Sequence, residues 1–402
     1  MSKTVEKRIA NFNNGRIKEL LEFKYKRMRQ DIFSFYRGSS HLYYEDLADA
    51  KNKIINSSPL TWVCGDLHLE NFGSYKADNR LVYFDINDFD DATLAPCLWE
   101  VSRVLVSIII AAKAEHLGKV SAKKLCDYFI EVYSQTLKEG HARLVEEETA
   151  EGIVYNLLHK LKKRKRKAFI KRRTQLVDGK RKLLLDGERT SALPKKLKKE
   201  IATAIKKWAK NKPNPDFYKI LDISYRIAGT GSLGLERYVV LVKGKGDPNN
   251  YLLDIKLAKP SPVLLYAKAK QPIWENDAQR IVAIQKRMQA FPPALLEYIK
   301  LNGNWFVIKE LQPTEDRVNL IDCNGQLVKL DAFIKTIASI TAWAQLRSDS
   351  RQGSATTDAL IEFASQKGWH KPLWDYVNNY SYKVSEYYKK FKYAYDNDYF
   401  KE

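Results

Sequence analysis

The chain has 402 residues, with 69 lysines and arginines against 48 aspartates and glutamates and a hydrophobic content of 45%. This length and composition exclude a mostly disordered protein and suit one large or two medium folded domains. The longest apolar run, residues 104–112, is too short to span a bilayer, and no apolar stretch of signal-peptide length begins the chain. We therefore expect a cytoplasmic protein without a transmembrane segment. Four scattered cysteines without a Cys-X-X-Cys pair argue against a zinc site or a disulfide framework: Cys64, Cys97, Cys126 and Cys323.

The formal charge of +21 is concentrated in one segment. Residues 160–212 contain 22 lysines and arginines against four acidic residues, so the rest of the chain carries a net charge of only +3. Such a segment is either a solvated helical face or a binding surface for a polyanion. Nucleic acid, an anionic lipid surface and a phosphorylated substrate all fit the second interpretation.

The first sixty residues predict helices. Two short apolar runs, residues 60–64 and 81–84, predict strands on either side of a loop. A buried helix is predicted over residues 99–112, where apolar residues recur every three or four positions. Helical character continues to about residue 173, and a second amphipathic helix is predicted after Pro194.

A Pro/Asn cluster at residues 211–215 predicts a domain boundary, and the pattern beyond it is that of β-structure. Five strands and one helix are expected, with the strands at 222–228, 235–242, 251–256, 295–299 and 305–311 and the helix at 274–289. Helices should form the tail, whose aromatic-rich residues 369–400 are either core or a base-stacking surface. The expected divisions are residues 1–215, 216–312 and 313–402.

Oxygen-bearing side chains cluster around the first two predicted strands. The run Gly65-Asp-Leu-His-Leu-Glu-Asn71 follows one strand, and Asp85-Ile-Asn-Asp-Phe-Asp-Asp91 ends the next. Capping and turn formation would account for some of these residues, but six acids and two asparagines are too many for capping alone. Carboxylate and amide oxygens are hard ligands of the kind that Mg²⁺ prefers together with substrate phosphates.

A second motif, Gly229-Thr-Gly-Ser-Leu-Gly234, is a GxGxxG sequence between two predicted strands. A dinucleotide fingerprint lies between a strand and a helix, so this placement favours the glycine-rich loop of a kinase. Lys256 follows on the next strand in an apolar setting, where a cation needs a negative partner. Glu275 on the predicted helix is the first expected partner and Asp277 the second.

Residues 65–71 resemble the catalytic loop of aminoglycoside phosphotransferases and related kinase-like enzymes, and residues 87–103 resemble their metal-binding segment and the helix that follows it. The resemblance implies that Asp66 is the catalytic base and that Asn71 and Asp88 hold the metal. Asp85 is a competing metal ligand, because it ends the strand one turn earlier. Glu100 stands where those enzymes usually have aspartate.

Most of the chain also resembles a bacterial family of unknown function, DUF2252, which is grouped with kinase-like folds. The resemblance rests on Phe35-Tyr-Arg-Gly38, on residues 65–73 and 84–90, and on the glycine-rich motif. The chain departs from that family at Gln345-Leu-Arg-Ser348, where His-Ala-Arg-Ser is usual.

The motifs occur in an unusual order, because the glycine loop and Lys256 follow the catalytic loop by more than 150 residues. The resemblance therefore implies an α+β, bilobal, protein-kinase-like fold that is circularly permuted. A mostly antiparallel β lobe would bind the nucleotide, and a helical lobe would carry the catalytic residues. Residues 310–312 would form the hinge whose backbone meets adenine.

The expected function is that of an ATP- and Mg²⁺-dependent phosphotransferase acting on an unidentified hydroxyl acceptor, which the basic segment suggests is acidic or phosphorylated. Asp66, Asn71 and Lys256 are the expected catalytic residues. The expected nucleotide-binding residues are Gly229, Thr230, Gly231, Ser232, Gly234, Lys256, Glu275, Glu310 and Leu311. Two alternatives stay open: nucleotidyl transfer at the same site, and a non-catalytic nucleotide- or nucleic-acid-binding protein that uses residues 160–212.

Overall fold

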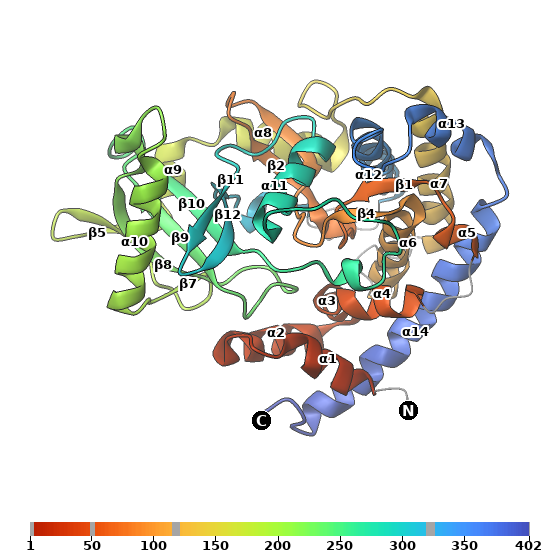
Figure 1. The fold of residues 1–402 in the computed structure, drawn as a ribbon, viewed down its shortest axis with the longest axis horizontal. Helices are drawn as coiled ribbons and strands as arrows, with labels where there is room; N and C mark the ends of the chain where they lie inside the picture. The colour runs from red at the N-terminus through yellow and green to blue at the C-terminus, as the bar shows by residue number, and fades with distance from the viewer. Residues whose placement is uncertain (1–3, 49–52, 115–120, 319–325, 402) are drawn as a thin grey trace.

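The computed structural model describes residues 4–48, 53–114, 121–318 and 326–401 (Figure 1). It combines helices with antiparallel sheets, which confirms the expected α+β class. The predicted N-terminal helices are present as α1 (Val5–Asn13), α2 (Lys18–Gln30), α3 (Ile32–Gly38), α4 (Ser40–Ala48) and α5 (Lys53–Asn56). Within the described ranges, no helix is both long enough and apolar enough to cross a membrane.

The helical part of the molecule is built around α6 (Cys97–Lys113), which is buried over almost its whole length. Around it lie α7 (Ala122–Glu139), α12 (Leu327–Arg347), α13 (Thr357–Ser365) and α14 (His370–Asp396), on the right of Figure 1. The last of these helices, α14, packs against α2, α3 and α6. Its Tyr380 and Phe391 are buried in the main core, so this part of the aromatic-rich tail serves packing.

Two small antiparallel pairs carry the two acidic loops. Strand β1 (Leu60–Val63) pairs with β4 (Thr93–Pro96), and β2 (Phe72–Lys76) pairs with β3 (Val82–Ile86). The predicted strands correspond to β1 and β3, whereas β2 and β4 were not expected. Both pairs are almost entirely buried, so the loops that follow β1 and β3 are held on a rigid support.

The larger sheet has six antiparallel strands in the order β11-β12-β10-β9-β8-β7. Five of them confirm predicted strands: β8 (Ile220–Arg226), β9 (Arg237–Val242), β10 (Tyr251–Leu257), β11 (Glu297–Leu301) and β12 (Asn304–Glu310). The predicted helix between β10 and β11 is α11 (Asp277–Met288), which begins three residues later than expected.

The basic segment is not continuously helical. Helices α8 (Gly152–Lys163), α9 (Arg166–Lys171) and α10 (Lys195–Ala209) alternate with strands β5 (Thr174–Val177), β6 (Lys180–Leu183) and β7 (Thr190–Ser191). Asp178 and Gly179 both have positive φ, 49° and 69°, at the two-residue turn between β5 and β6. Helix α10 buries Ile201 and Ile205 in the same cluster as the large sheet, so the β part of the molecule begins before residue 216.

Alternation along the strands gives the large sheet two different faces. One face is apolar and packs against α10 through residues such as Val240 and Ile255. The opposite face carries Val239 and Leu252, covered by α9 and β6, and further along the strands it carries the charged residues of the site. This opposite face is turned toward the loop that follows β3, as the contacts of Lys256 described below show.

Candidate active site

A cavity of about 310 Å³ joins motifs that lie far apart in the sequence. The loop after β1, the loop after β3, the glycine loop between β8 and β9, and the turn between α1 and α2 all line it. The expected site residues among its lining are Asp66, Asn71, Asp88, Gly229, Thr230, Gly231 and Ser232. Their assembly in one cavity is the main structural support for the predicted site.

The loop after β1 is held by two side chains of α6. The Glu100 carboxylate accepts the backbone N–H of Cys64 at 2.7 Å, and Arg103 Nε donates to Asp66 Oδ1 at 2.8 Å. Burial raises the pKa of Asp66, and the guanidinium of Arg103 opposes that rise. Gly65 has φ +91°, and a Cβ at this position would collide with the Asp91 backbone, so the turn requires glycine.

Asn71 and Asp88 lie at the same end of the β2–β3 pair. The backbone N–H of Asn87 donates to the Asn71 carbonyl at 2.8 Å and so continues the ladder beyond the strands. The Asn71 side chain donates its Nδ2 to the backbone carbonyl of Asp66. The chain thereby brings one amide and one carboxylate to the wall of the same cavity.

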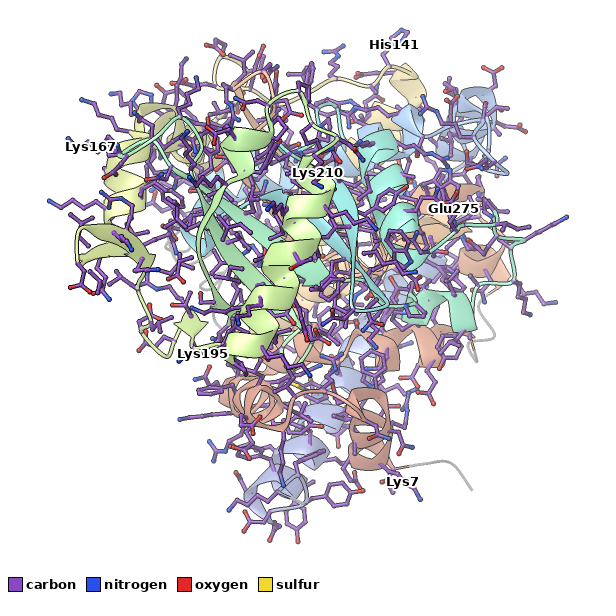
Figure 2. The ribbon with its side chains drawn as sticks, turned by 60° about the vertical axis from the view of Figure 1, so that its left-hand side comes forward. Lys7, His141, Lys167, Lys195, Lys210 and Glu275 are labelled. Carbon is purple, nitrogen blue, oxygen red and sulfur yellow. The ribbon has the colours of Figure 1, made fainter. Side chains whose placement is uncertain are left out.

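Lys256 pairs with aspartates of the loop after β3 and not with Glu275. Its Nζ forms an ion pair with Asp90 and lies 3.7 Å from Asp88 Oδ2. Glu275 is exposed in the connection before α11, at the outer surface in Figure 2, and Asp277 pairs with Arg280 at 3.1 Å. The expected partners were wrong because the lysine side of β10 is covered by the 87–91 loop rather than by the start of α11.

Positive charges dominate the surroundings of Asp88. Burial would raise the pKa of Asp88, but Lys256, Lys309 and Arg317 outweigh it and lower the pKa to about 2. Burial lowers the pKa of Lys309 to about 8. Asp88 is therefore ionised at neutral pH and is surrounded by cations. Such a site suits a metal ion that is shared with an anionic ligand.

Asp85 does not belong to the cavity. It is 4% exposed, its Oδ2 lies 3.8 Å from Arg347 Nη1, and it accepts the backbone N–H of Ala290 at 3.4 Å. Because Asp85 is inside strand β3, strand alternation turns it toward α12, whereas Asp88 follows the strand end. The structure thus places Asp88 and not Asp85 with Asn71.

No group of three His, Cys, Asp or Glu side chains within the described residues is arranged to hold a metal ion. Mg²⁺ does not require such a cage, because one or two protein oxygens commonly suffice when phosphates supply the rest. The ionised Asp88 and the amide of Asn71 fit that requirement. The buried cysteines Cys64, Cys97 and Cys126 are free, and Cys323 lies outside the described residues.

The glycine loop lies between two strands, as predicted, and is held by the N-terminal helices. Arg16 Nη1 donates to the carbonyls of Gly231 and Leu233, each at 2.8 Å, and Lys24 Nζ donates to the Gly231 carbonyl at 3.0 Å. Gly234 has φ +89° and does not line the cavity, but its carbonyl accepts the backbone N–H of Ile17 at 2.9 Å. No local sequence signal points to Arg16 or Lys24, because their partners in the glycine loop are more than 200 residues away.

Two backbone N–H groups of the expected hinge, residues 310–312, already form hydrogen bonds within the protein. The N–H groups of Glu310 and Leu311 donate to the carbonyls of Ala294 and Leu252, each at 2.8 Å. The Glu310 carboxylate pairs with Arg166 at 2.7 Å. Neither N–H is free to bind a base, so this part of the hinge prediction was wrong. The Leu311 side chain lines a separate cavity of about 60 Å³ on the site-bearing face of the sheet.

The comparisons with known proteins identify a family but no characterised relative. A family model described as an uncharacterized protein conserved in bacteria (DUF2252) matches residues 16–394. No curated protein and no solved structure matches the chain. The family match includes the glycine loop, both acidic loops and Lys256, and it extends over most of the sequence. The chain is therefore a member of the DUF2252 family.

Proposed function

We propose that this protein is an ATP- and Mg²⁺-dependent phosphotransferase with a kinase-like, circularly permuted arrangement of two lobes, working in the cytoplasm. The observation that carries the proposal is the shared cavity of the glycine loop, Asp66, Asn71 and Asp88, with Lys256 in contact with the same acidic loop. A glycine-rich loop, a lysine and metal-binding oxygens are the parts that phosphoryl transfer requires, because its catalysis is mainly positioning and charge stabilisation.

The phosphates would lie under residues 229–232, where the absence of side chains at Gly229 and Gly231 lets the backbone approach closely. Lys256 would exchange its contact with Asp90 for the phosphates. The base would occupy the smaller cavity, where Val239, Leu252 and Leu311 offer apolar contacts. The base would then be held by apolar contacts in this cavity and not by hydrogen bonds from the backbone N–H groups of residues 310 and 311.

Asp88 and Asn71 would hold Mg²⁺, which when bound would neutralise negative charge on the phosphates. Asp66 would orient the acceptor hydroxyl and receive its proton. The acceptor oxygen then bonds to the γ-phosphorus, the bond from that phosphorus to the β–γ bridging oxygen breaks, and ADP leaves. Burial raises the proton affinity of Asp66, which favours this role, while Arg103 fixes the carboxylate in place.

ADP formation from ATP tests the proposal, with Mg²⁺ and a small-molecule extract of a bacterium as the source of acceptors. We expect D66N and D88N each to lower the rate at least 100-fold, because each removes a charged group from the reacting centre. D85N is the matched control, since Asp85 is also a buried aspartate of the same segment but lies outside the cavity.

Unchanged turnover in D66N or D88N would contradict the proposed roles. The products distinguish the two transfer reactions. Release of ADP supports phosphoryl transfer, whereas release of pyrophosphate would show nucleotidyl transfer at the same site.

A further inference from the structure

The basic segment 160–212 presents a large set of lysines to solvent. Figure 2 shows Lys195 and Lys210 at opposite ends of α10 and Lys167 at the outer edge of α9. None of these three forms an ion pair among the described residues, and all are exposed. The same holds for Lys165, Lys171, Lys180, Lys196, Lys199, Lys206 and Lys207. The surface is therefore free to bind an anionic partner.

The hairpin formed by β5 and β6 adds apolar side chains to this basic surface. Leu176 is 61% exposed and Val177 is 42% exposed beside the turn, and Leu185 just after the hairpin is 51% exposed. Leu176 is paired with Arg181 and Val177 with Lys180, so apolar and basic residues face each other across the strands. What distinguishes these aliphatic side chains from other exposed ones is that they are grouped on one hairpin beside basic residues.

The hairpin and α10 lie on opposite faces of the large sheet and meet at its β8 edge. Asp222 of β8 joins them, because its Oδ1 lies 3.0 Å from Lys198 Nζ of α10 and its Oδ2 accepts the backbone N–H of Leu183 of β6 at 3.0 Å. Figure 1 shows β5 projecting at the outer edge of the molecule beside α10. An extended anionic surface can therefore contact the hairpin and the lysine helix together.

The aromatic content of the segment argues against nucleic acid as the partner. Its two aromatic residues are Phe169, which is buried, and Trp208, which packs against Tyr218 at a ring distance of 4.8 Å. Neither is free to stack on bases, which is the usual source of affinity for single strands. Nucleic acid would also leave the exposed leucines and valine in water, whereas a lipid interface would bury them.

We propose that residues 160–212 form a docking surface for an anionic lipid bilayer. Leu176 and Val177 enter the headgroup–acyl boundary, and the lysines of α9 and α10 bind the charged headgroups. Reversible membrane association combines two weak contributions, the burial of apolar side chains and the attraction of basic side chains to anionic headgroups. The inference does not depend on the phosphotransferase activity.

The first test is co-sedimentation of the full chain with vesicles of phosphatidylglycerol and phosphatidylcholine, compared with vesicles of phosphatidylcholine alone. We expect binding to the anionic vesicles only, weakened at least tenfold in L176S/V177S. The matched control is L265S/I273S, because Leu265 and Ile273 are 78% and 98% exposed but lie outside the basic segment. Equal loss in both double variants, or no loss in the first, would overturn the proposal.

The second test replaces charge. K199Q/K206Q/K210Q, on α10 and at its C-terminal cap, should weaken binding to anionic vesicles at least tenfold. K389Q/K390Q/K392Q on α14 removes the same charge from another exposed helix surface and should leave binding unchanged. If the chain binds an RNA or DNA oligonucleotide but not vesicles, its partner is nucleic acid and the lipid proposal is refuted. Absence of binding to anionic vesicles by the wild-type chain would also refute the proposal.

Discussion

Lys256 stands between two aspartates with opposite pKa shifts. Cations lower the pKa of Asp88 to about 2, while burial and the neighbouring charge of Asp88 raise the pKa of Asp90. Asp88 and Asp90, which are two positions apart in the sequence, therefore differ in their affinity for a proton. The ionised Asp88 suits metal binding, whereas Asp90 forms the ion pair with Lys256.

The buried carboxyl group of Glu100 makes the stability of the protein depend on pH. Burial raises its pKa from 4.5 to about 7, so the folded protein holds a proton there that the unfolded chain releases. Its contribution to stability is most favourable below about pH 4.5 and declines as the pH rises through about 7. The E100Q variant keeps the oxygen that accepts the Cys64 N–H and removes this titration.

We expect the free energy of unfolding of E100Q, relative to wild type, to rise between about pH 5 and about pH 8 by roughly 1–3 kcal/mol, at about 1.4 kcal/mol per pKa unit. Urea denaturation at the two pH values measures it. A difference between variant and wild type that is the same at both pH values would contradict the raised pKa.

Some residues of the candidate site could be predicted from the spacing of nearby residues in the sequence, and others could not. Asp66, Asn71 and Asp88 lie in short loops beside predicted strands, so each motif could be found from neighbouring residues alone. The partner of Lys256 could not, because the choice between Glu275 and Asp90 depends on which segment covers β10.

At the scale of elements, α2 holds the glycine loop. Lys24 is 0% exposed, and its Nζ donates to Asn13 Oδ1 at 2.8 Å and to the Gly231 carbonyl at 3.0 Å. Burial lowers the pKa of Lys24 well below its ordinary value. The hydrogen bonds of Lys24 offset the cost of burying its charge, and they make α2 part of the proposed nucleotide site.

The K24M variant should loosen residues 229–234 and weaken ATP binding three- to tenfold, because it removes a donor from the loop carbonyl. Hydrogen exchange of the loop amides together with an ATP titration measures both effects. K26M is the control, since Lys26 is exposed on the same helix. The role of Lys24 is refuted if both variants show the same exchange in the loop and the same affinity.

The strand–loop–strand arrangement of the glycine motif was predicted because β-branched and aromatic residues mark β9 clearly. The hairpin of β5 and β6 was missed because its lysines resemble a helical charge run. The Asp178-Gly179 pair is the signal that would have revealed it, since both residues adopt the positive φ of a tight hairpin turn.

At the scale of the whole molecule, the proposed permutation needs chain ends that can be joined, and the first and last helices, α1 and α14, contact each other. Arg8 Nη1 of α1 donates to the Tyr387 hydroxyl of α14 at 3.0 Å. Short paths between termini allow a chain to be joined and reopened elsewhere. Sequence order suggested the permutation, which stays a prediction; the contact between α1 and α14 shows only that the first and last helices are adjacent.

A chain reopened between Lys212 and Pro213, with its original ends joined by about ten Gly/Ser residues spanning about 17 Å, would place the glycine loop before residues 65–71. We expect it to fold and to bind ATP with Mg²⁺ within about threefold of wild type, because residues 213–216 are exposed. Circular dichroism and an ATP titration measure the two properties. A folded permutant that has lost nucleotide binding would contradict the account.

The most direct test of the phosphotransferase proposal is calorimetric titration of ATP into the wild-type chain and D88A, each with and without Mg²⁺. Binding that requires Mg²⁺ in the wild type and falls at least tenfold in D88A is the predicted result, since Asp88 is the ionised carboxylate of the cavity. The account is contradicted if the wild type does not bind ATP, or if both proteins bind it equally well.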